Sequence, residues 1–256
     1  MDALEQKYQR LQDILTQFGS VAVAFSGGVD STFLLYAAQD TLGDNTLAVT
    51  AVTAALPQRE RQGAEAICAQ LGVRRLVYPL DVLALPAFQT NPPDRCYHCK
   101  KRIFAAIAQA AAADGYPVLL DGTNASDDAG DRPGLRALRE LEVRSPLREC
   151  GLTKAEIRAQ SKKAGLFTHN KPAYACLATR IPTGTAITAG DLERVEAAEG
   201  ALFALGFTDF RVRLLSGAAR IQLPADQWDR ASEQREAIRK ALSPRFDAVL
   251  LDLETR

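Results

Sequence analysis

The chain has 256 residues, of which 47% are hydrophobic and 24% charged, and its 31 lysines and arginines balance 31 aspartates and glutamates. This composition excludes a disordered or fibrous chain, and the zero net charge disfavours a broadly basic nucleic-acid-binding protein. The length predicts one large domain or two small ones, with room for a substantial core.

Helices and strands are expected to alternate through the first half of the chain. Apolar residues at helical spacing predict a first helix over 2–18, and the almost wholly apolar run 21–25 is typical of a strand buried on both faces. The alternation continues with helix 31–42, strand 46–52, helix 58–71, strand 76–80, helix 95–113 and strand 118–120. Strands separated by helices of this length predict the α/β fold class, with a parallel sheet and crossover helices on its faces.

The second half of the chain has a different order of elements. A short helix is expected near 135–141, a capped helix over 153–163, and an irregular segment over 168–187. The predicted elements after it are helix 191–205, strands 210–215 and 219–223 joined as a hairpin by Ser216-Gly217, helix 227–242 and strand 248–253. We therefore expect two domains, an α/β domain over 1–180 and a small α+β domain over 181–256.

A glycine-containing loop follows the first predicted strand. Its two glycines allow a sharp turn and a close backbone approach to a ligand, and the amides at the next helix start, with nearby hydroxyls, form an anion-binding nest. The residues predicted to bind a nucleotide phosphate are Ser26, Gly27, Gly28, Asp30, Ser31 and Thr32. The loop contains no lysine to grip a transferred phosphate, and Asp30 is placed to hold Mg²⁺. The alternative is an ordinary turn with a helix cap.

A second loop follows the fourth predicted strand. Asp121-Gly122-Thr123-Asn124 lies where the carboxyl ends of parallel strands gather and where open α/β sheets bind ligands. Gly122 is therefore added to the predicted nucleotide site. The polar residues that follow either line the mouth of that site or belong to a solvated loop: Asp127, Asp128, Asp131 and Arg132.

Five cysteines, an odd number in a long chain, do not suggest a disulfide framework. Cys176 lies in the irregular segment, where Lys171 and Arg180 are placed to favour its nucleophilic thiolate, although a buried apolar cysteine is the alternative. Cys68 is assigned to the core of a helix. Cys150, in a turn, is assigned no role.

Cys96 and Cys99 are three residues apart at a predicted helix start, so both sulfurs point to one side. His98 lies between them and does not share that face. Structural zinc normally takes four ligands, and no second pair of this kind is present. Together with Cys176, the pair supplies the three ligands of a [4Fe–4S] cluster with one open iron, whereas a redox pair or a chance spacing remains an alternative.

Two arginines and a glutamate are candidates for binding an anionic substrate. Arg211 and Arg213 are two residues apart on a predicted strand, so both guanidinium groups project from one face and suit a phosphate or carboxylate. The alternative is a half-exposed strand with a polar face. Glu199 is placed either in the same cleft or, with Glu193 and Glu196, on a solvated helix face. His169 is expected to be structural.

The loop string S-G-G-V-D-S resembles the PP-loop of ATP pyrophosphatases, a group that includes NAD synthetase, GMP synthetase, asparagine synthetase and tRNA sulfur transferases. That resemblance implies attack of an acceptor oxygen on the α-phosphate of ATP, departure of pyrophosphate into the loop, and adenine binding near Thr50-Ala51-Val52. Together with D-R-P-G-L at 131–135, C-L-A-T-R at 176–180, F-R-V-R at 210–213 and the terminal α+β unit, the chain resembles the LarE family over essentially its whole length.

The LarE resemblance implies an ATP-dependent sulfurtransferase that thiolates a pyridinium biscarboxylic acid mononucleotide during biosynthesis of the nickel-pincer nucleotide cofactor of lactate racemase. It favours substrate roles for Arg211, Arg213 and Glu199. In the sacrificial type the cysteine matching Cys176 loses its own sulfur, whereas Cys96 and Cys99 make this chain similar to the three-cysteine, cluster-bearing type. The expected cofactors are ATP, Mg²⁺ and a [4Fe–4S] cluster.

The partner expectations are a small-molecule substrate, a homo-oligomer, which the family resemblance suggests is a hexamer, and neither nucleic acid nor membrane. No apolar run approaches the roughly 18 residues of a membrane span, and the N-terminus lacks the basic start of a signal peptide. We therefore expect a cytoplasmic protein. The alternative functions are a tRNA thiolase, an amide-forming enzyme of the NAD synthetase kind, and a non-catalytic iron–sulfur carrier.

Overall fold

The computed structural model describes residues 2–127 and 133–255. The chain divides into two compact units built from interleaved segments. The first comprises Met1–Thr53, Gln58–Leu80 and Asp94–Lys171, and the second Ala54–Pro57, Asp81–Pro93 and Pro172–Arg256. The division of the sequence at residue 180 stays a prediction.

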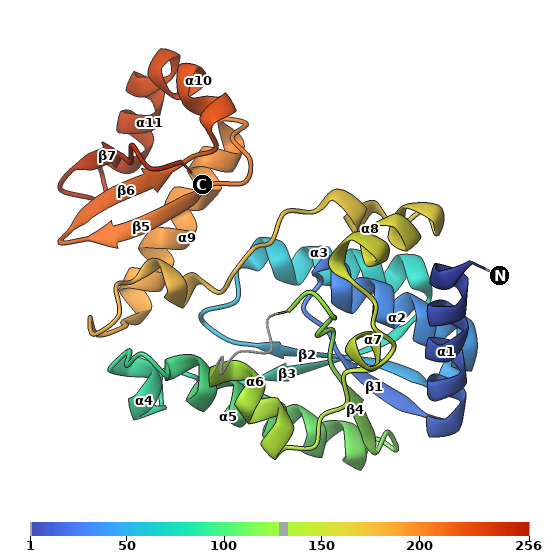
Figure 1. Cartoon of the computed structure of the whole chain (residues 1–256). Coiled ribbons are helices and arrows are strands. Elements are labelled where there is room, and N and C mark those ends of the chain that lie inside the picture. Colours follow the sequence, from blue (N-terminus) through green and yellow to red (C-terminus); the bar gives the residue numbers. More distant parts are fainter. Residues whose placement is uncertain (1, 128–132, 256) are drawn as a thin grey trace. The chain divides into compact units, whose positions relative to one another are not determined.

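A four-stranded parallel sheet forms the centre of the first unit (Figure 1). Its strands are β1 (Val21–Ala24), β2 (Thr46–Val52), β3 (Arg74–Pro79) and β4 (Val118–Leu120). Their order is β3-β2-β1-β4, with Val21 opposite both Thr46 and Val118. The parallel pairing confirms the predicted α/β class.

Helices cover both faces of this sheet, and β1 is buried between them. Val21 and Val23 pack with residues of α1 (Ala3–Phe18), α2 (Val29–Leu42) and α3 (Gln58–Leu71), whereas Ala22 packs with Ile107 and Ala111 on α5 (Arg95–Ala113). The remaining helices of this unit are η1 (Gly43–Asn45), α6 (Pro133–Glu140), α7 (Pro146–Glu149), α8 (Lys154–Lys163) and η2 (Phe167–Asn170). The alternation of contacts along β1 explains why the run is apolar at successive positions.

The second unit contains a mixed three-stranded sheet in the order β5-β6-β7. Strands β5 (Arg211–Leu215) and β6 (Ala218–Gln222) are antiparallel, and β7 (Val249–Leu251) pairs parallel to β6. The predicted hairpin is confirmed, because Ser216 and Gly217 have φ of +47° and +85°, as the turn between closely connected antiparallel strands requires. The helices of this unit are α4 (Pro86–Gln89), η3 (Leu177–Arg180), α9 (Ala189–Ala204), η4 (Ala225–Gln227), α10 (Trp228–Glu233) and α11 (Arg235–Leu242).

Three local predictions need correction. The helix expected over 227–242 is two helices, because the backbone of Gln234 leaves the helical region at φ −94° and ψ 12°. The four-residue helices α4 and α7 were not predicted, since each is too short to show a period. Strand β3 begins at Arg74 rather than 76, because this edge strand is only partly buried and starts with two arginines.

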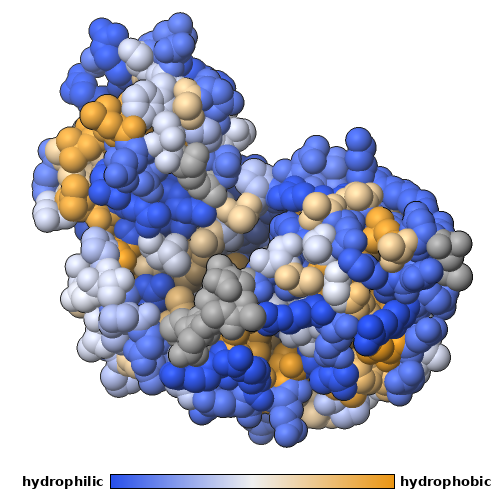
Figure 2. All heavy atoms as spheres, in the orientation of Figure 1, coloured by the Kyte–Doolittle hydropathy of each residue, from blue (hydrophilic) through white to orange (hydrophobic). Residues whose placement is uncertain are grey.

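The visible surface of each unit is mostly hydrophilic (Figure 2). No helix within residues 2–127 and 133–255 has the length and apolar character needed to cross a membrane.

Candidate active site

The loop Ser26–Thr32 connects β1 to the first turn of α2, as the sequence predicts. Gly27 has φ +71°, a left-handed conformation that favours glycine. Gly28 is the N-cap of α2 and makes no side-chain hydrogen bond to the first-turn amides of that helix. The hydroxyl oxygens of Ser26 and Ser31 lie 3.1 Å apart. Backbone amides and hydroxyls are thus gathered at one helix start, an arrangement suited to phosphate oxygens.

Gly122, in the loop after β4, packs directly against this helix start. A Cβ atom added to Gly122 would lie 2.8 Å from the backbone nitrogen of Ser31. The structure therefore brings together the two predicted nucleotide-binding loops, and only glycine permits their contact.

Asp30, predicted to hold Mg²⁺, forms an ion pair with Lys154 at the start of α8. Its other carboxylate oxygen, Oδ1, is buried and has no hydrogen-bond partner among the described residues. The hydroxyl of Thr32 is likewise buried without a partner in the described part of the chain. These two oxygens leave hydrogen-bonding or metal-binding capacity at the loop, so the donor set fits Mg²⁺ on a phosphate.

A second lysine also reaches the loop. The ammonium group of Lys171 donates to the carbonyl oxygen of Gly27 at 2.9 Å and to Glu60 at 2.7 Å. Sequence reasoning missed Lys154 and Lys171 because they lie 124 and 144 residues from their loop partners. The only local signal was the capping box of α8, in which Thr153 and Glu156 place Lys154 at the first helical position.

Asp121 anchors the loop after β4 rather than facing solvent. Its carboxylate accepts hydrogen bonds from the hydroxyls of Ser145 and Thr123. Burial raises the pKa of this carboxyl above its ordinary value, and the two hydroxyls oppose that effect. Asp127 accepts from the amide of Asn124 at 2.9 Å. The other residues proposed to line this mouth, Asp128, Asp131 and Arg132, lie outside the described residues.

In the second unit, Cys176 is exposed and lies within a segment held at both sides. Arg211 donates to the carbonyl oxygen of Ala173 at 3.5 Å, and Arg213 donates to the carbonyl oxygen of Thr179 at 2.8 Å. The amide of Leu177 donates to Ala55 at 3.0 Å. The two predicted substrate arginines therefore contact the chain three residues before and three residues after Cys176.

A buried ion pair lies beneath this segment. The guanidinium Nε of Arg180 is 2.7 Å from Oε1 of Glu199, and the two side chains are 0% and 1% exposed. The same oxygen accepts the amide of Val212 on β5 at 3.0 Å. Glu199 is therefore not on the solvated face that Glu193 occupies. Its contacts hold η3 and β5 together, and its role toward substrate stays a prediction.

The two cations that were expected to favour the Cys176 thiolate have carboxylate partners within their own units. Lys171 pairs with Glu60, and Arg180 pairs with Glu199. The influence of these cations on the Cys176 thiolate stays a prediction.

Cys96 and Cys99 are the second and fifth residues of α5, where Cys96 is exposed and Cys99 half-buried. His98 contacts Asp94 at 3.1 Å instead of joining them. Cys68 and Cys150 are buried, and burial raises the pKa of each thiol to about 11. The assignment of Cys68 to the core is thereby confirmed.

The predicted cluster ligands are divided between the units, with Cys96 and Cys99 in the first and Cys176 in the second. Within the described parts of the chain, no three His, Cys, Asp or Glu side chains form a group able to hold a metal ion. A shared [4Fe–4S] cluster therefore stays a prediction.

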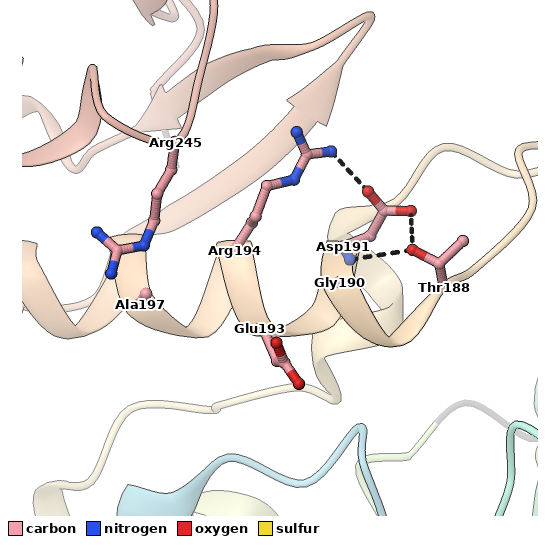
Figure 3. Close-up of a pocket in the computed structure, with 7 residues that line it drawn as sticks. All are labelled: Thr188, Gly190, Asp191, Glu193, Arg194, Ala197 and Arg245. Atoms are coloured by element: carbon pink, nitrogen blue, oxygen red, sulfur yellow. Dashed lines mark hydrogen bonds and ion pairs between the residues drawn. The ribbon is translucent and has the colours of Figure 1, made fainter.

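A pocket of about 530 Å³ lies on α9 in the second unit (Figure 3). Arg194 and Arg245 line it, with Arg194 paired to Asp191 at 2.6 Å. Glu193 points away from both arginines. None of the predicted site residues lines this pocket.

Known proteins with similar sequences include nucleotide-using enzymes, in line with the parallel sheet and the Ser26–Thr32 loop. Residues 3–110 match the NAD synthase family. The chain is 37% identical to a pyridinium-3,5-bisthiocarboxylic acid mononucleotide synthase of Lactiplantibacillus plantarum, over 88% of this chain and 82% of the synthase. It is 38% identical to an uncharacterized protein of Synechocystis, over 88% of this chain and 84% of that protein. A tRNA-specific 2-thiouridylase of Streptomyces coelicolor is 28% identical over 59% of this chain and 51% of its own. The chain thus belongs to the LarE family, the ATP-dependent sulfurtransferases typified by the Lactiplantibacillus synthase.

Proposed function

We propose that the chain converts a pyridinium biscarboxylic acid mononucleotide to its thiocarboxylate, in biosynthesis of a nickel-pincer nucleotide. The observation that carries this proposal is the Cys176 segment. An exposed thiol lies between two backbone carbonyls that accept from Arg211 and Arg213, so a sulfur and two anion-recognising groups share one short stretch of the second unit.

The first chemical step is adenylation. A substrate carboxylate oxygen attacks the α-phosphorus of ATP, the bond from that phosphorus to the bridging oxygen breaks, and pyrophosphate leaves with the electron pair. The Ser26–Thr32 amides and hydroxyls stabilise the leaving charge. Mg²⁺, held by Asp30, would add positive charge there. Activation is needed because an oxide ion is a poor leaving group and AMP a good one.

Substrate recognition is assigned to Arg211 and Arg213. A mononucleotide phosphate or a carboxylate presents paired oxygens that suit a guanidinium fork. Both arginines now donate to backbone carbonyls of the Cys176 segment, which are neutral acceptors. An anionic acceptor forms the stronger hydrogen bond, so substrate competes favourably for the same donors.

The sulfur is proposed to pass through a cluster rather than to come from Cys176. The residues that would hold a [4Fe–4S] cluster are Cys96, Cys99 and Cys176, the three cysteines that are not buried. Such a cluster would supply an iron able to carry sulfide. In the sacrificial alternative, the Cys176 thiolate displaces AMP to form a thioester. Loss of the Cα proton then breaks the Cβ–Sγ bond and leaves dehydroalanine.

Anaerobic purification with iron and sulfide analysis, followed by turnover with ATP and substrate, tests these statements. We expect iron in the unaltered chain and in Cys68→Ala, no iron in Cys96→Ser, and an intact Cys176 by mass spectrometry after turnover. Dehydroalanine at Cys176 without bound iron would overturn the cluster pathway. Absence of ATP-dependent thiocarboxylate under every condition would overturn the function.

A tRNA thiolase is the second candidate, because a 2-thiouridylase is among the relatives. It predicts pyrophosphate release that depends on tRNA. We expect release to depend on the pyridinium mononucleotide and to be unchanged by added tRNA, since zero net charge disfavours a broad phosphate-backbone surface.

A further inference from the structure

We infer that Lys154 is the pyrophosphate-binding lysine that the Ser26–Thr32 loop lacks, and that Asp30 holds it in place until nucleotide arrives. The inference rests on the adenylation step of the proposed function and names the residue that serves its leaving group. Lys154 is on α8, far along the chain from the loop, and its ammonium contacts the Asp30 carboxylate.

The position of Lys154 in its helix is locally unfavourable. It is the first residue of α8, where the helix dipole is positive and a lysine is disfavoured. Lys162, in the last turn of the same helix, is where a cation is favoured. Departure from a local rule is expected at functional positions. The Lys154 ammonium reaches the start of another helix, α2, because it pairs with Asp30 in the first turn of that helix.

The backbone around Lys154 is fixed by contacts that are independent of its ammonium group. Thr153 and Glu156 form a capping box, and the Lys154 amide donates to the hydroxyl of Ser126 at 2.9 Å, in the loop after β4. Glu156 is held in turn by Lys7 at 2.7 Å. The Lys154 backbone is therefore fixed without Asp30, and Asp30 positions only the ammonium group at the end of the side chain.

The pair between Lys154 and Asp30 is suited to exchange. Their side chains are 34% and 23% exposed, so solvent screens the attraction and little stability is lost when the pair opens. Asp30 by itself would repel phosphates, and Lys154 neutralises it. Asp30 would be the residue that holds Mg²⁺ when ATP binds, and the Lys154 ammonium would then be available to the β- and γ-phosphates.

The chemical role follows from where charge develops. As the substrate carboxylate attacks the α-phosphorus, the electrons of the breaking bond move to pyrophosphate. Lys154 donates a hydrogen bond to that anion and keeps its own proton. Lys171 is less suited to this role, because its ammonium already bridges Gly27 and the buried Glu60.

Calorimetric titration of inorganic pyrophosphate with Mg²⁺ tests the assignment. We expect Lys154→Ala to weaken binding by about 10- to 100-fold, the range of a hydrogen bond to a charged group. Lys154→Arg should recover part of that loss, and Lys162→Ala should bind as the unaltered chain does. Circular dichroism of each variant confirms that it is folded. Equal affinity in Lys154→Ala and Lys162→Ala would overturn the inference.

Asp30→Asn supplies a second signature that does not depend on the stability of Lys154→Ala. Without Mg²⁺ this variant should bind pyrophosphate more tightly than the unaltered chain, because Lys154 is released and a repelling charge is gone. With Mg²⁺ it should bind more weakly, because the metal ligand is lost. The same sign in both conditions would contradict the exchange.

A parallel assay distinguishes failure of this inference from failure of the proposed function. It measures the substrate-dependent exchange of pyrophosphate into ATP. If the unaltered chain shows exchange and Lys154→Ala retains full pyrophosphate affinity, only the role of Lys154 fails. If the unaltered chain neither binds pyrophosphate nor shows exchange, the proposed function and this inference both fail.

Discussion

The Ser26–Thr32 loop and the Cys176 segment use opposite means to place functional groups. The loop is built by backbone, with Gly27 in a left-handed conformation and Gly122 in close contact with the α2 helix start. The Cys176 segment is built by side chains, because guanidinium groups from β5 and η3 hold its carbonyls and a buried carboxylate. We therefore expect the loop to be sensitive to added side-chain atoms and the Cys176 segment to be sensitive to the loss of a charged group.

The largest effect is expected at the buried pair of the second unit. Glu199→Ala leaves Arg180 charged and buried, which costs about 3–5 kcal/mol of unfolding free energy. Urea unfolding measures this loss. Glu193→Ala, on the exposed face of the same helix, should change stability by less than about 0.5 kcal/mol. Similar values for the two variants would contradict the side-chain basis of this region.

The backbone basis of the first unit is tested at Gly122. A methyl group there meets the Ser31 backbone, so Gly122→Ala should cost about 1–3 kcal/mol and sharply lower ATP affinity. Gly200→Ala is the matched control, since its added Cβ meets no atom within 4 Å in the middle of α9. That variant should be more stable by about 0.5–1 kcal/mol. If Gly122→Ala keeps both its stability and its ATP affinity, the close contact between the two loops is not required for either.

Thr32 and Thr46 separate ligand binding from stability within the first unit. Both hydroxyls are buried without partners among the described residues, but Thr46 starts β2 opposite Val21, at the end of β1 away from the loop. Thr32→Val should lower ATP affinity about tenfold, the value of one hydrogen bond to a charged group. Thr46→Val should leave ATP affinity unchanged. Titration calorimetry and thermal unfolding measure both, and equal ATP affinities would remove Thr32 from the site.

The smallest effect concerns the support of Lys154. Lys7 and the Thr153 cap lower the pKa of Glu156 to about 2 from 4.5. Because the folded-state pKa is depressed, this contribution is fully present above about pH 4.5 and is lost as pH falls toward 2. Glu156→Gln should lose about 1 kcal/mol at pH 7 and show a flatter acid unfolding profile. If Glu156→Gln leaves the slope of unfolding free energy against pH unchanged between pH 4.5 and 2, the contacts of Glu156 are not the source of the pH dependence.

Elements whose contacts are local could be predicted from the sequence. The buried run of β1, the glycine loop, α2 and the Ser216-Gly217 hairpin each depend on residues a few positions apart, and the structure has all of them. The parallel sheet followed because crossover helices of that length permit little else. The helix over 227–242 was predicted as unbroken because its pattern gives no sign of the break at Gln234.

The sequence by itself determined the position and conformation of the Ser26–Thr32 loop. It also indicated which cysteines and arginines are candidates for the site. Only the tertiary structure decided that Lys154 and Lys171 reach that loop, and that Glu199 is buried with Arg180 while Glu193 is exposed. The physical reason is range. Backbone conformation follows from neighbouring residues, whereas the partner of a charge depends on which distant segments packing brings beside it.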